Sequence, residues 1–417
     1  MKLRAITAGL LFCLIAVPQV WASEPLTLEK CIITALENHP DLKAAEARID
    51  SKRAAVGEAE SSGRPQVSAG TAYTRSAGSE TDGSSGRYGV SAALDQSVYD
   101  WGKRGLKVKG AELNAEAVFM DYRQTRDAVI SSVKSAYYGL NRSVREYEVA
   151  KTRYENYQKR LVWAKSYYEV GTKAKIEVTK AQADLASSKL LLVRADSSAA
   201  QYRAELASAM GDPLLKIANA ADAIGYEAWA ISADEALKRA ELNRPELAAK
   251  SKRVEYAKAA LALAKKGLTP DLTASAGYNF YGAAPFDDNE WSAKLSLKIP
   301  IYDGGLTKSK TEGAEADLRT ASAEFMSLSN SVKLEVRKAW EALREAYEAL
   351  ASSQEAERQQ KETLGLAEGR YKAGVGSSLE ISDAIESYAA AQTNTVQSLY
   401  QCKSARLALE KAMGGLE

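Results

Sequence analysis

Few residues of this chain are of the types that carry out covalent chemistry. The 417-residue sequence holds one histidine, His39, and three cysteines, Cys13, Cys31 and Cys402. A structural zinc site needs about four Cys or His ligands, and a catalytic triad needs a histidine base, so both are disfavoured. His39 precedes Pro40 and is expected to be a surface residue of a helical region. We therefore predict no enzymatic activity, no metal site and no cofactor.

Acidic residues that follow two glycine-containing turns are the other chemical candidates. The turns lie at 168–172 and 371–376, and a glycine in each suits a chain reversal with positive φ. The carboxylates that follow them are Glu177, Glu380 and Asp383. One interpretation is that these are solvated side chains in the first turns of helices, where the helix dipole favours negative charge.

The charge balance argues against nucleic-acid binding. Lys and Arg number 56 and Asp and Glu number 54 over the whole sequence. Nucleic-acid-binding proteins carry an excess of basic side chains that neutralise phosphates, and this chain has almost none. We therefore expect no nucleic-acid partner.

Residues 1–22 are predicted to be an export signal. Lys2 and Arg4 precede an apolar run from Ala5 to Val17, and Val-Trp-Ala at 20–22 has small residues where a signal peptidase cleaves. No later stretch of 18 apolar residues occurs, so no transmembrane helix is expected. The mature chain should be exported, without a lipid anchor.

The sequence contains an internal duplication, with an offset of 205 positions in its first part and 203 positions afterwards. The matching motifs are Asn38-His39-Pro40 with Asn243-Arg244-Pro245, Tyr99-Asp100-Trp101-Gly102 with Tyr302-Asp303-Gly304-Gly305, and Met210-Gly211 with Met413-Gly414. Because packed helices lose register on insertion whereas loops do not, the constant offset predicts long packed helices. The predicted units are a first repeat at 23–213, a linker at 214–230 and a second repeat at 231–417.

Each repeat is predicted to contain the same series of elements. An Ala/Glu/Lys-rich helix ends at a proline and is followed by two strands with alternating polarity. A long helix without proline comes next, and a shorter helix returns after the glycine turn. The predicted ranges are 27–62 and 232–266 for the initial helices, 67–73, 88–94, 272–280 and 291–299 for the strands, 103–168 and 306–371 for the long helices, and 173–210 for the first return helix.

The number of strands limits how they could close. Alternation over about ten residues is typical of outer-membrane barrel strands, although a soluble hairpin with one wet face shows the same pattern. Four strands cannot close a barrel, because about eight are needed, so a membrane barrel would be shared between subunits. The predicted fold class is mainly α with a membrane β-barrel portion, built from long α-helical hairpins plus four β-strands per chain.

The whole pattern resembles the TolC-like outer-membrane efflux proteins. The resemblance covers residues 27–414 and rests on the order and duplication of the motifs. It implies a homotrimer in which a twelve-stranded barrel, surrounded by outer-membrane lipid, continues into a twelve-helix periplasmic tunnel. It also implies a passive exit duct of a tripartite efflux or type I secretion system, docked to a periplasmic adaptor protein and an inner-membrane pump of the RND, ABC or MFS type. A secreted coiled-coil or adaptor protein is the alternative, but it leaves the alternating strands unexplained.

The resemblance also assigns roles to residues near the two turns. Glu380 and Asp383 match an acidic ring that lines the periplasmic aperture, and Tyr371 with Glu177 matches a hydrogen-bonded latch. Gly376 stands where the family has the latch arginine, which predicts a weaker closed state. The residues expected to form the periplasmic tips and the adaptor contact are Val170, Gly171, Thr172, Gly374, Val375 and Gly376.

Two cysteines remain in the mature chain. Cys31 lies in the first turns of the initial helix and Cys402 near the end of the last helix, so both are expected at mid-height of the tunnel. In the oxidising periplasm a Cys31–Cys402 disulfide could form if the Cα atoms lie within about 7 Å. The alternative is two partly buried thiols in different helix interfaces.

Overall fold

The computed structural model describes residues 26–76, 85–217, 231–283 and 286–416. The predicted export signal at 1–22 and most of the predicted linker at 214–230 lie outside these residues. Both halves of the described chain contain two short helices, two strands and two long helices, in the same order. The elements are α1 (Leu28–Asn38), α2 (Pro40–Ser61), β1 (Gln66–Ser76), β2 (Ser85–Tyr99), α3 (Lys103–Glu169), α4 (Lys175–Ala209), α5 (Ala233–Asn243), α6 (Pro245–Ala264), β3 (Asp271–Gly282), β4 (Asp288–Lys298), α7 (Leu306–Lys372) and α8 (Ser378–Ala412).

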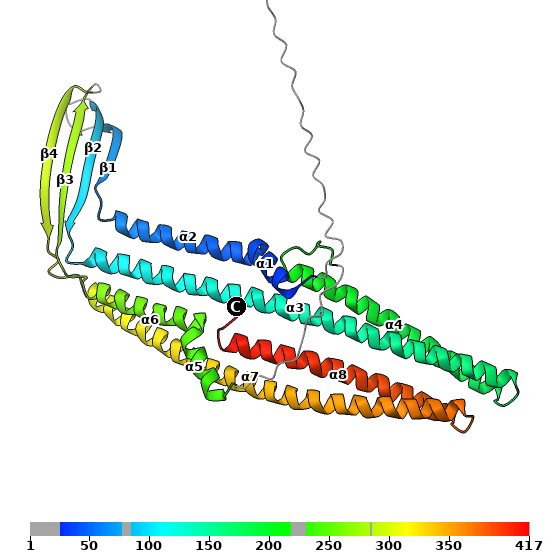
Figure 1. Cartoon of the computed structure of the whole chain (residues 1–417). Helices are drawn as coiled ribbons and strands as arrows, with labels where there is room; N and C mark the ends of the chain where they lie inside the picture. Colours follow the sequence, from blue (N-terminus) through cyan, green and yellow to red (C-terminus); the bar gives the residue numbers. More distant parts are fainter. Residues whose placement is uncertain (1–25, 77–84, 218–230, 284–285, 417) are drawn as a thin grey trace, which may run out of the picture.

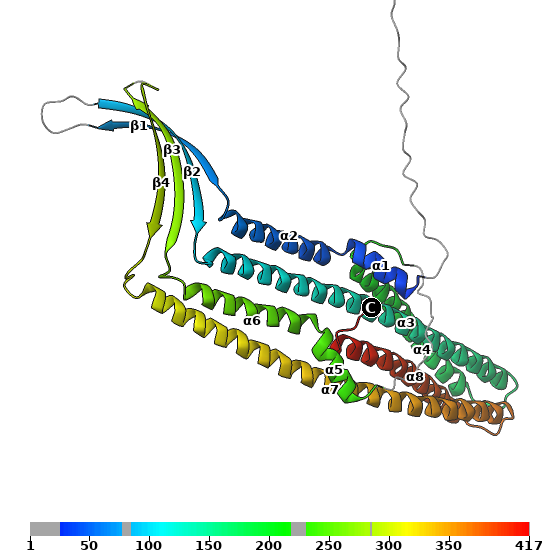
Figure 2. The same cartoon turned by 60° about the vertical axis from the view of Figure 1, so that its left-hand side comes forward.

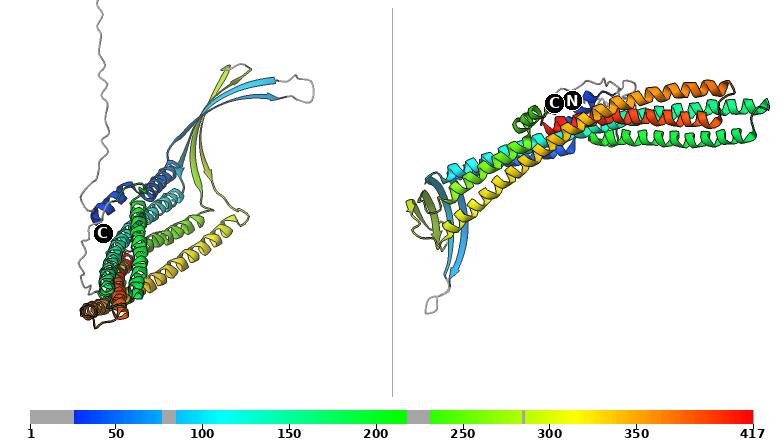
Figure 3. Two further views of the ribbon diagram at one scale, coloured as in Figure 1. Left: turned by 90° about the vertical axis from the view of Figure 1, so that its right-hand side faces the viewer. Right: turned by 90° about the horizontal axis from the view of Figure 1, so that it is seen from below.

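The molecule is elongated, with the strands at one end and two helix tips at the other (Figures 1 and 3). Helices α3 and α7 have 67 residues each, which corresponds to about 100 Å of helix. Near the strands α3 lies against α2 and α6, and toward the tips it lies against α4 and α8. None of the helices in the described ranges is long and apolar enough to cross a membrane.

The short helices α1 and α5 are separated from α2 and α6 by a break at a proline (Figure 2). Proline disfavours the helical conformation in the residue before it. His39 is accordingly extended (φ −63°, ψ 125°), and so is Arg244 (φ −67°, ψ 116°). The expectation of uninterrupted initial helices was therefore wrong at these two positions. Pro40 and Pro245 each begin the next helix, where a missing N–H group costs nothing.

The four strands form one antiparallel sheet in the order β1-β2-β3-β4. In the first repeat Gln66 lies opposite Asp95, and in the second Asp271 lies opposite Lys298. These pairs are related by the sequence offsets of 205 and 203, so the duplication preserves strand register to the residue. Strands β2 and β3 join the two repeats within the chain, while β1 and β4 are the edges.

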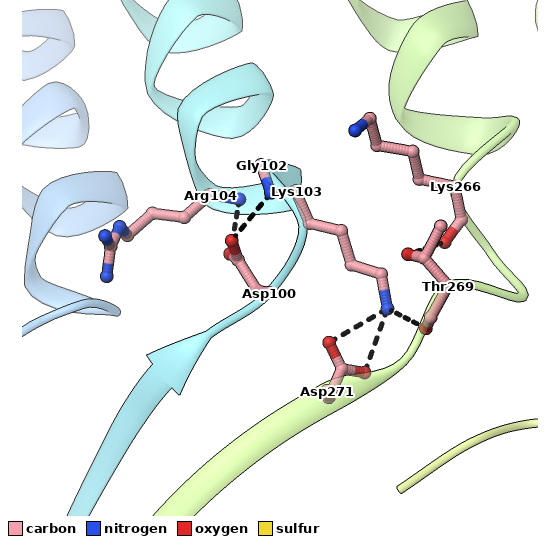
Figure 4. A network of polar contacts seen from close by, with 7 residues as sticks. All are labelled: Asp100, Gly102, Lys103, Arg104, Lys266, Thr269 and Asp271. Carbon is pink, nitrogen blue, oxygen red and sulfur yellow. Dashed lines mark hydrogen bonds and ion pairs between the residues drawn. The ribbon is translucent and has the colours of Figure 1, made fainter. Parts of the chain in front are cut away.

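The joint between sheet and helices is polar within the chain (Figure 4). The Asp100 carboxylate accepts hydrogen bonds from the backbone N–H groups of Gly102 (3.0 Å) and Arg104 (2.6 Å) and thereby caps α3. Lys103 Nζ then reaches across to the second repeat, where it lies 2.9 Å from the Thr269 carbonyl oxygen and from both Asp271 carboxylate oxygens.

At the matching point of the second repeat the capping aspartate is kept, but an apolar residue replaces the lysine. Asp303 caps α7 through the N–H groups of Gly305 (3.1 Å) and Thr307 (2.8 Å), as Asp100 does for α3. The position of Lys103, however, is taken by Leu306, which is 54% exposed in the single chain. The two repeats thus share a cap and differ in the residue that begins the long helix, a lysine bound to the other repeat in α3 and an exposed leucine in α7.

Each repeat has its own core around its short helices. One cluster contains Cys31 with residues of α3 and α4, and a second contains Cys402 with residues of α5 and α7. Both thiols are buried, and neither is bridged within the described residues. The possible Cys31–Cys402 disulfide is thus not formed, because the two side chains pack into separate clusters. Burial raises the pKa of Cys31 to about 12.

Candidate functional site at the hairpin tips

The two tip turns share one backbone form. Gly171 (φ 76°) and Gly374 (φ 77°) are left-handed, the conformation that glycine adopts at helix ends without steric cost. In the first turn the Thr172 N–H donates to the Tyr167 carbonyl oxygen at 2.9 Å. The predicted turn residues all lie at these tips: Val170, Gly171, Thr172, Gly374, Val375 and Gly376.

The tips present apolar side chains to solvent. Val170 and Val375 are 70% and 69% exposed. Behind Val375 the chain turns so closely that a Cβ atom on Gly376 would lie 2.8 Å from the Tyr371 backbone nitrogen. Any side chain at 376 would therefore require the turn to open, which gives a local reason for glycine at this position.

Tyr371 is the central side chain of the tip core. It is 1% exposed, and its ring lies 6.2 Å from the Trp163 ring and 5.7 Å from the Tyr167 ring, measured between centroids. Burial raises the pKa of Tyr371, and the nearby Glu177 carboxylate raises it further. The Tyr371 hydroxyl and Glu177 Oε2 are both buried without a hydrogen-bond partner among the described residues. The structure thus brings the two predicted latch residues near each other without the predicted bond.

Glu380 and Asp383 lie on one side of the second tip. Glu380 stands in the first turn of α8, where Ser377 Oγ accepts a hydrogen bond from its N–H at 3.0 Å. Its carboxylate lies 2.8 Å from Arg370 Nε on α7. Together these residues line an open groove between α7 and α8, about 570 Å³ in volume, which also includes Leu366. The groove is therefore acidic at one rim and neutralised by one arginine.

A buried arginine, not predicted from the sequence, joins the two hairpins. Arg160 of α3 is 1% exposed. Its guanidinium binds Asp184 of α4 and donates to Ser378 Oγ of α8 at 2.8 Å. A buried charge is tolerated where it is paired and hydrogen-bonded. Arg160 therefore fixes three helices relative to one another just above the tips.

A second ion pair lies two turns further from the tips. Arg153 Nη2 of α3 lies 2.6 Å from Glu386 Oε1 of α8, and the Tyr157 hydroxyl donates to the same carboxylate. Burial is the largest cause of a raised Tyr157 pKa, followed by this hydrogen bond. The only available sequence signal was a charge inside an apolar stripe: Arg160 interrupts the helical spacing of Tyr157 and Ala164.

The chemistry of this site is electrostatic. Among the described residues no group of three or more His, Cys, Asp or Glu side chains could hold a metal ion. What the tips contain is a set of carboxylates and arginines between helices, together with exposed valines. Such an arrangement can attract cations, hold two hairpins together and contact another protein.

Comparison with known proteins agrees with this architecture. The family described as "Outer membrane efflux protein" matches residues 32–212 and again 236–415. The outer membrane protein TolC of Vibrio cholerae is 25% identical over 411 residues, which cover 95% of this chain and 92% of TolC. The Escherichia coli TolC is 24% identical, with 91% of this chain and 80% of TolC covered.

Solved structures share the fold at lower identity. CusC superposes with a TM-score of 0.83 at 18% identity, over 93% of this chain and 92% of CusC. VceC of Vibrio cholerae superposes with a TM-score of 0.80 at 21% identity, over 93% of this chain and 96% of VceC. Two matches to one family, which together span most of the sequence, settle its membership: the chain belongs to the outer membrane efflux protein family.

Proposed function

We propose that this chain is a passive exit duct through the outer membrane, serving a tripartite efflux or type I secretion system. The observation that carries the proposal is the division of one chain into two parts. A four-stranded sheet lies at one end, and helices of about 100 Å run from it to a pair of tips. The sheet suits the membrane and the helices suit the periplasm.

Three copies would complete the duct. Strands β1 and β4 are edges with unpaired backbone groups, a state that favours pairing with another strand. Closed barrels need about eight strands or more, so one chain cannot close a barrel alone, and among the possible cyclic assemblies we propose the trimer that the TolC-like family implies. Twelve strands would then surround the pore, and the hairpins of three chains would form the tunnel.

The tips would form the aperture. Threefold symmetry would bring the Glu380 and Asp383 carboxylates of three chains toward one axis, where crowded negative charges attract multivalent cations. Tyr371 and Glu177 would form a latch in the closed state. The support for this latch is that both polar atoms are buried and unpartnered, so a small shift that joins them would be favourable.

The same tips would bind the partners. Val170 and Val375 are exposed apolar side chains on otherwise polar turns, and exposed apolar side chains of this kind are common at protein contacts. A periplasmic adaptor would dock there, and an inner-membrane pump of the RND, ABC or MFS type would deliver the substrate. The duct itself would remain passive.

The assembly can be tested through the register of the sheet. Within the chain Leu94 of β2 lies opposite Ala276 of β3. By the sequence offsets, Leu94 corresponds to Leu297 of β4, 203 positions later, and Ala276 corresponds to Thr71 of β1, 205 positions earlier. If β4 of one copy pairs with β1 of the next copy as β2 pairs with β3, Leu297 and Thr71 lie opposite each other. The variant Thr71→Cys with Leu297→Cys should therefore form an interchain disulfide and a covalent trimer on denaturing electrophoresis.

A matched control keeps this test specific. Thr71→Cys with Ser296→Cys should stay monomeric, because a one-residue shift turns the side chain to the other face. Native mass spectrometry in detergent should show a trimer for both variants, and planar bilayers should show its conductance. A monomeric, non-conducting protein in the soluble periplasmic fraction would instead support the coiled-coil alternative.

A further inference from the structure

The helix breaks at His39 and Arg244 occupy equivalent places in the two repeats. Each residue precedes the proline that begins the next helix, and each lies against the glycine that follows a return helix. A Cβ atom on Gly211 would lie 3.0 Å from the His39 Cα atom, and a Cβ atom on Gly414 would lie 2.8 Å from the Arg244 backbone nitrogen. The surroundings of the two side chains can therefore be compared residue by residue.

In the second repeat the Arg244 side chain fills the space between the helix ends and is 6% exposed. Its Nε donates to the Ala412 carbonyl oxygen at the end of α8 at 2.9 Å. Its two terminal nitrogens lie 2.8 Å from the Glu246 carboxylate and 2.7 Å from the Glu335 carboxylate. All three nitrogens of the guanidinium are thus paired, which makes burial of its charge tolerable.

In the first repeat a cavity of about 580 Å³ lies beside His39 and is lined by α3, α4 and α8. The imidazole, which is shorter than an arginine side chain, turns back onto its own helix, where Nδ1 accepts a hydrogen bond from the Asp41 N–H at 3.2 Å. The cavity wall includes Ser132 and Ala209, which lie 203 positions before two partners of Arg244. The first repeat thus keeps the space but not the side chain that fills it.

The Ala209 carbonyl oxygen remains as an acceptor in this wall. The last four carbonyl groups of a helix have no partner inside it. In α4 the first three of them accept hydrogen bonds from backbone N–H groups just beyond the helix: those of Leu206, Ala207 and Ser208. Ala209 has no such donor among the described residues, because Pro213, four positions later, has no N–H group. Its carbonyl oxygen lies at the negative end of the α4 dipole, where a cation is favoured.

Two side chains of opposite charge also line the cavity. Glu205 lies one turn before Ala209 on the same face of α4, and Lys411 lies on α8. Neither forms an ion pair with the other or with any residue in the described ranges. A cavity with an anionic wall and a cationic wall is complementary to a molecule that carries both charges.

We propose that this cavity binds a small zwitterion with a guanidinium group at one end and a carboxylate at the other. The guanidinium takes the place that the Arg244 side chain takes in the second repeat, with the Ala209 carbonyl oxygen and Glu205 as its acceptors. The carboxylate lies toward Lys411. Because the site lies within a single chain, it does not depend on the proposed assembly, and it adds a ligand to a duct that is otherwise passive.

Three related ligands test the two charges. The first, γ-guanidinobutyrate, carries both. In γ-ureidobutyrate a neutral urea replaces the guanidinium, and butylguanidine lacks the carboxylate. Saturation-transfer NMR titrations of the detergent-purified full-length protein should show saturable binding of γ-guanidinobutyrate. Each of the other two should bind about tenfold more weakly, the effect expected for the loss of one hydrogen bond to a charged group.

Substitutions locate the site. Glu205→Gln should weaken the binding of γ-guanidinobutyrate about tenfold. Asp196→Asn is the matched control and should leave binding unchanged, because Asp196 is an exposed carboxylate on the opposite face of α4. His39→Arg with Ser132→Glu copies the arrangement of the second repeat into the first, and it should abolish binding by filling the cavity.

The possible results decide between the site and its absence. Binding that is unchanged in Glu205→Gln or in the filled variant overturns the site, and so does a lack of saturable binding by the unaltered protein. Equal binding of butylguanidine overturns the assignment of a zwitterion and the role of Lys411. None of these titrations reports on the number of chains, which native mass spectrometry measures, so failure of the site and failure of the duct are distinguishable.

Discussion

The α3/α4 and α7/α8 hairpins have the same lengths and the same glycine turns, but their corresponding grooves differ in charge. In the first hairpin the groove contains Arg160, paired with Asp184 and covered by α8. In the second the corresponding residues are Thr363 and Ser387, and the groove is open. At these two positions the covered surface is ionic, whereas the open one has small neutral side chains and carries its charges at the rim.

The difference has a physical reason. A buried arginine is stable only if its partner is always present, because an unpaired buried charge is strongly unfavourable. Within one chain Asp184 and Ser378 are always available to Arg160. A surface that must be exposed before a neighbour arrives and covered afterwards is better served by Thr, Ser and Ala, which tolerate both states. The two hairpins thus suggest a permanent contact and a contact that forms on assembly.

The substitution Arg160→Met is expected to have the largest effect and tests this comparison of the two hairpins. It keeps the side-chain length but removes the charge, so Asp184 loses its partner. We expect a loss of about 3 kcal/mol in the free energy of unfolding, the low end for breaking a buried pair because Asp184 is partly exposed. Guanidinium denaturation in detergent, followed by helical circular dichroism, would measure the loss.

Thr363→Val is the control for Arg160→Met in the other hairpin. A surface substitution of this kind should change the free energy of unfolding by no more than about 0.5 kcal/mol. Equal effects of the two substitutions would mean that the grooves do not differ in the way described.

The second test concerns the two tyrosines that end the long helices. Tyr371→Phe should raise the resting conductance in planar bilayers about tenfold, because a hydrogen bond to a charged group contributes roughly 1.5–3 kcal/mol and the Glu177 latch would be lost. Tyr168→Phe, at the copied position, should leave the conductance unchanged. An unaltered conductance in Tyr371→Phe would argue against the latch.

The third test concerns the carboxylates at the groove rim. Glu380→Gln with Asp383→Asn should weaken block by multivalent cations from the periplasmic side roughly fivefold or more, since one contact between unit charges in water is worth about 1 kcal/mol at 4 Å. Lys180→Met, at the position that corresponds to Asp383 in the first hairpin, supplies a control that leaves Glu177 intact. If this variant weakened the block equally, the aperture would not be specific to the second hairpin.

The smallest expected effect is a difference in alkylation rate between the two buried thiols, one in each core. Because the pKa of Cys31 is about 12, only about one Cys31 in 10,000 is a thiolate at pH 8, and alkylation of the folded protein should be very slow. Cys402 also has a raised pKa, chiefly through burial, but Tyr347 and nearby basic residues oppose the rise, so it should react first. Mass mapping after timed alkylation would show the order, and faster modification of Cys31 would contradict it.

The same thiol gives a pH dependence of stability. A neutral Cys31 is favoured in the folded state, so its contribution is complete below pH 9, the ordinary thiol pKa, and is lost as the pH rises toward about 12. Cys31→Ala should reduce this alkaline loss. An unchanged loss between pH 9 and 11 would mean that other groups cause it.

Local sequence rules predicted most of the fold. Alternation placed the strands, and the proline-free stretch from Lys103 predicted a helix to 168, against an observed end at Glu169. The resemblance to TolC-like proteins is confirmed by the family match. The break between α1 and α2 at His39 was not predicted, although Pro40 supplies a local cause. It was missed because the helical spacing of apolar residues continues across the break.

The site was only partly predictable. The tip turns are determined by residues that are adjacent in the sequence, so Gly171 and Gly374 were enough to predict where they lie. The partners of Arg160 and Arg153 lie on other helices, and Glu386 is 233 positions from Arg153. Such pairings depend on how four helices pack, which no local pattern reports. The roles of Glu380 and Asp383 stay predictions.

The pairing of β2 with β3 has a consequence for how the protein matures. The two strands belong to one polypeptide, so they meet at a high effective concentration that does not depend on how much protein the cell makes. Strand β4 and the exposed Leu306 can be covered only by collision with another molecule. Folding of a single chain should therefore be first-order and completion of the barrel higher-order, so low expression would lengthen the time that adhesive strand edges remain exposed to proteases and to aggregation.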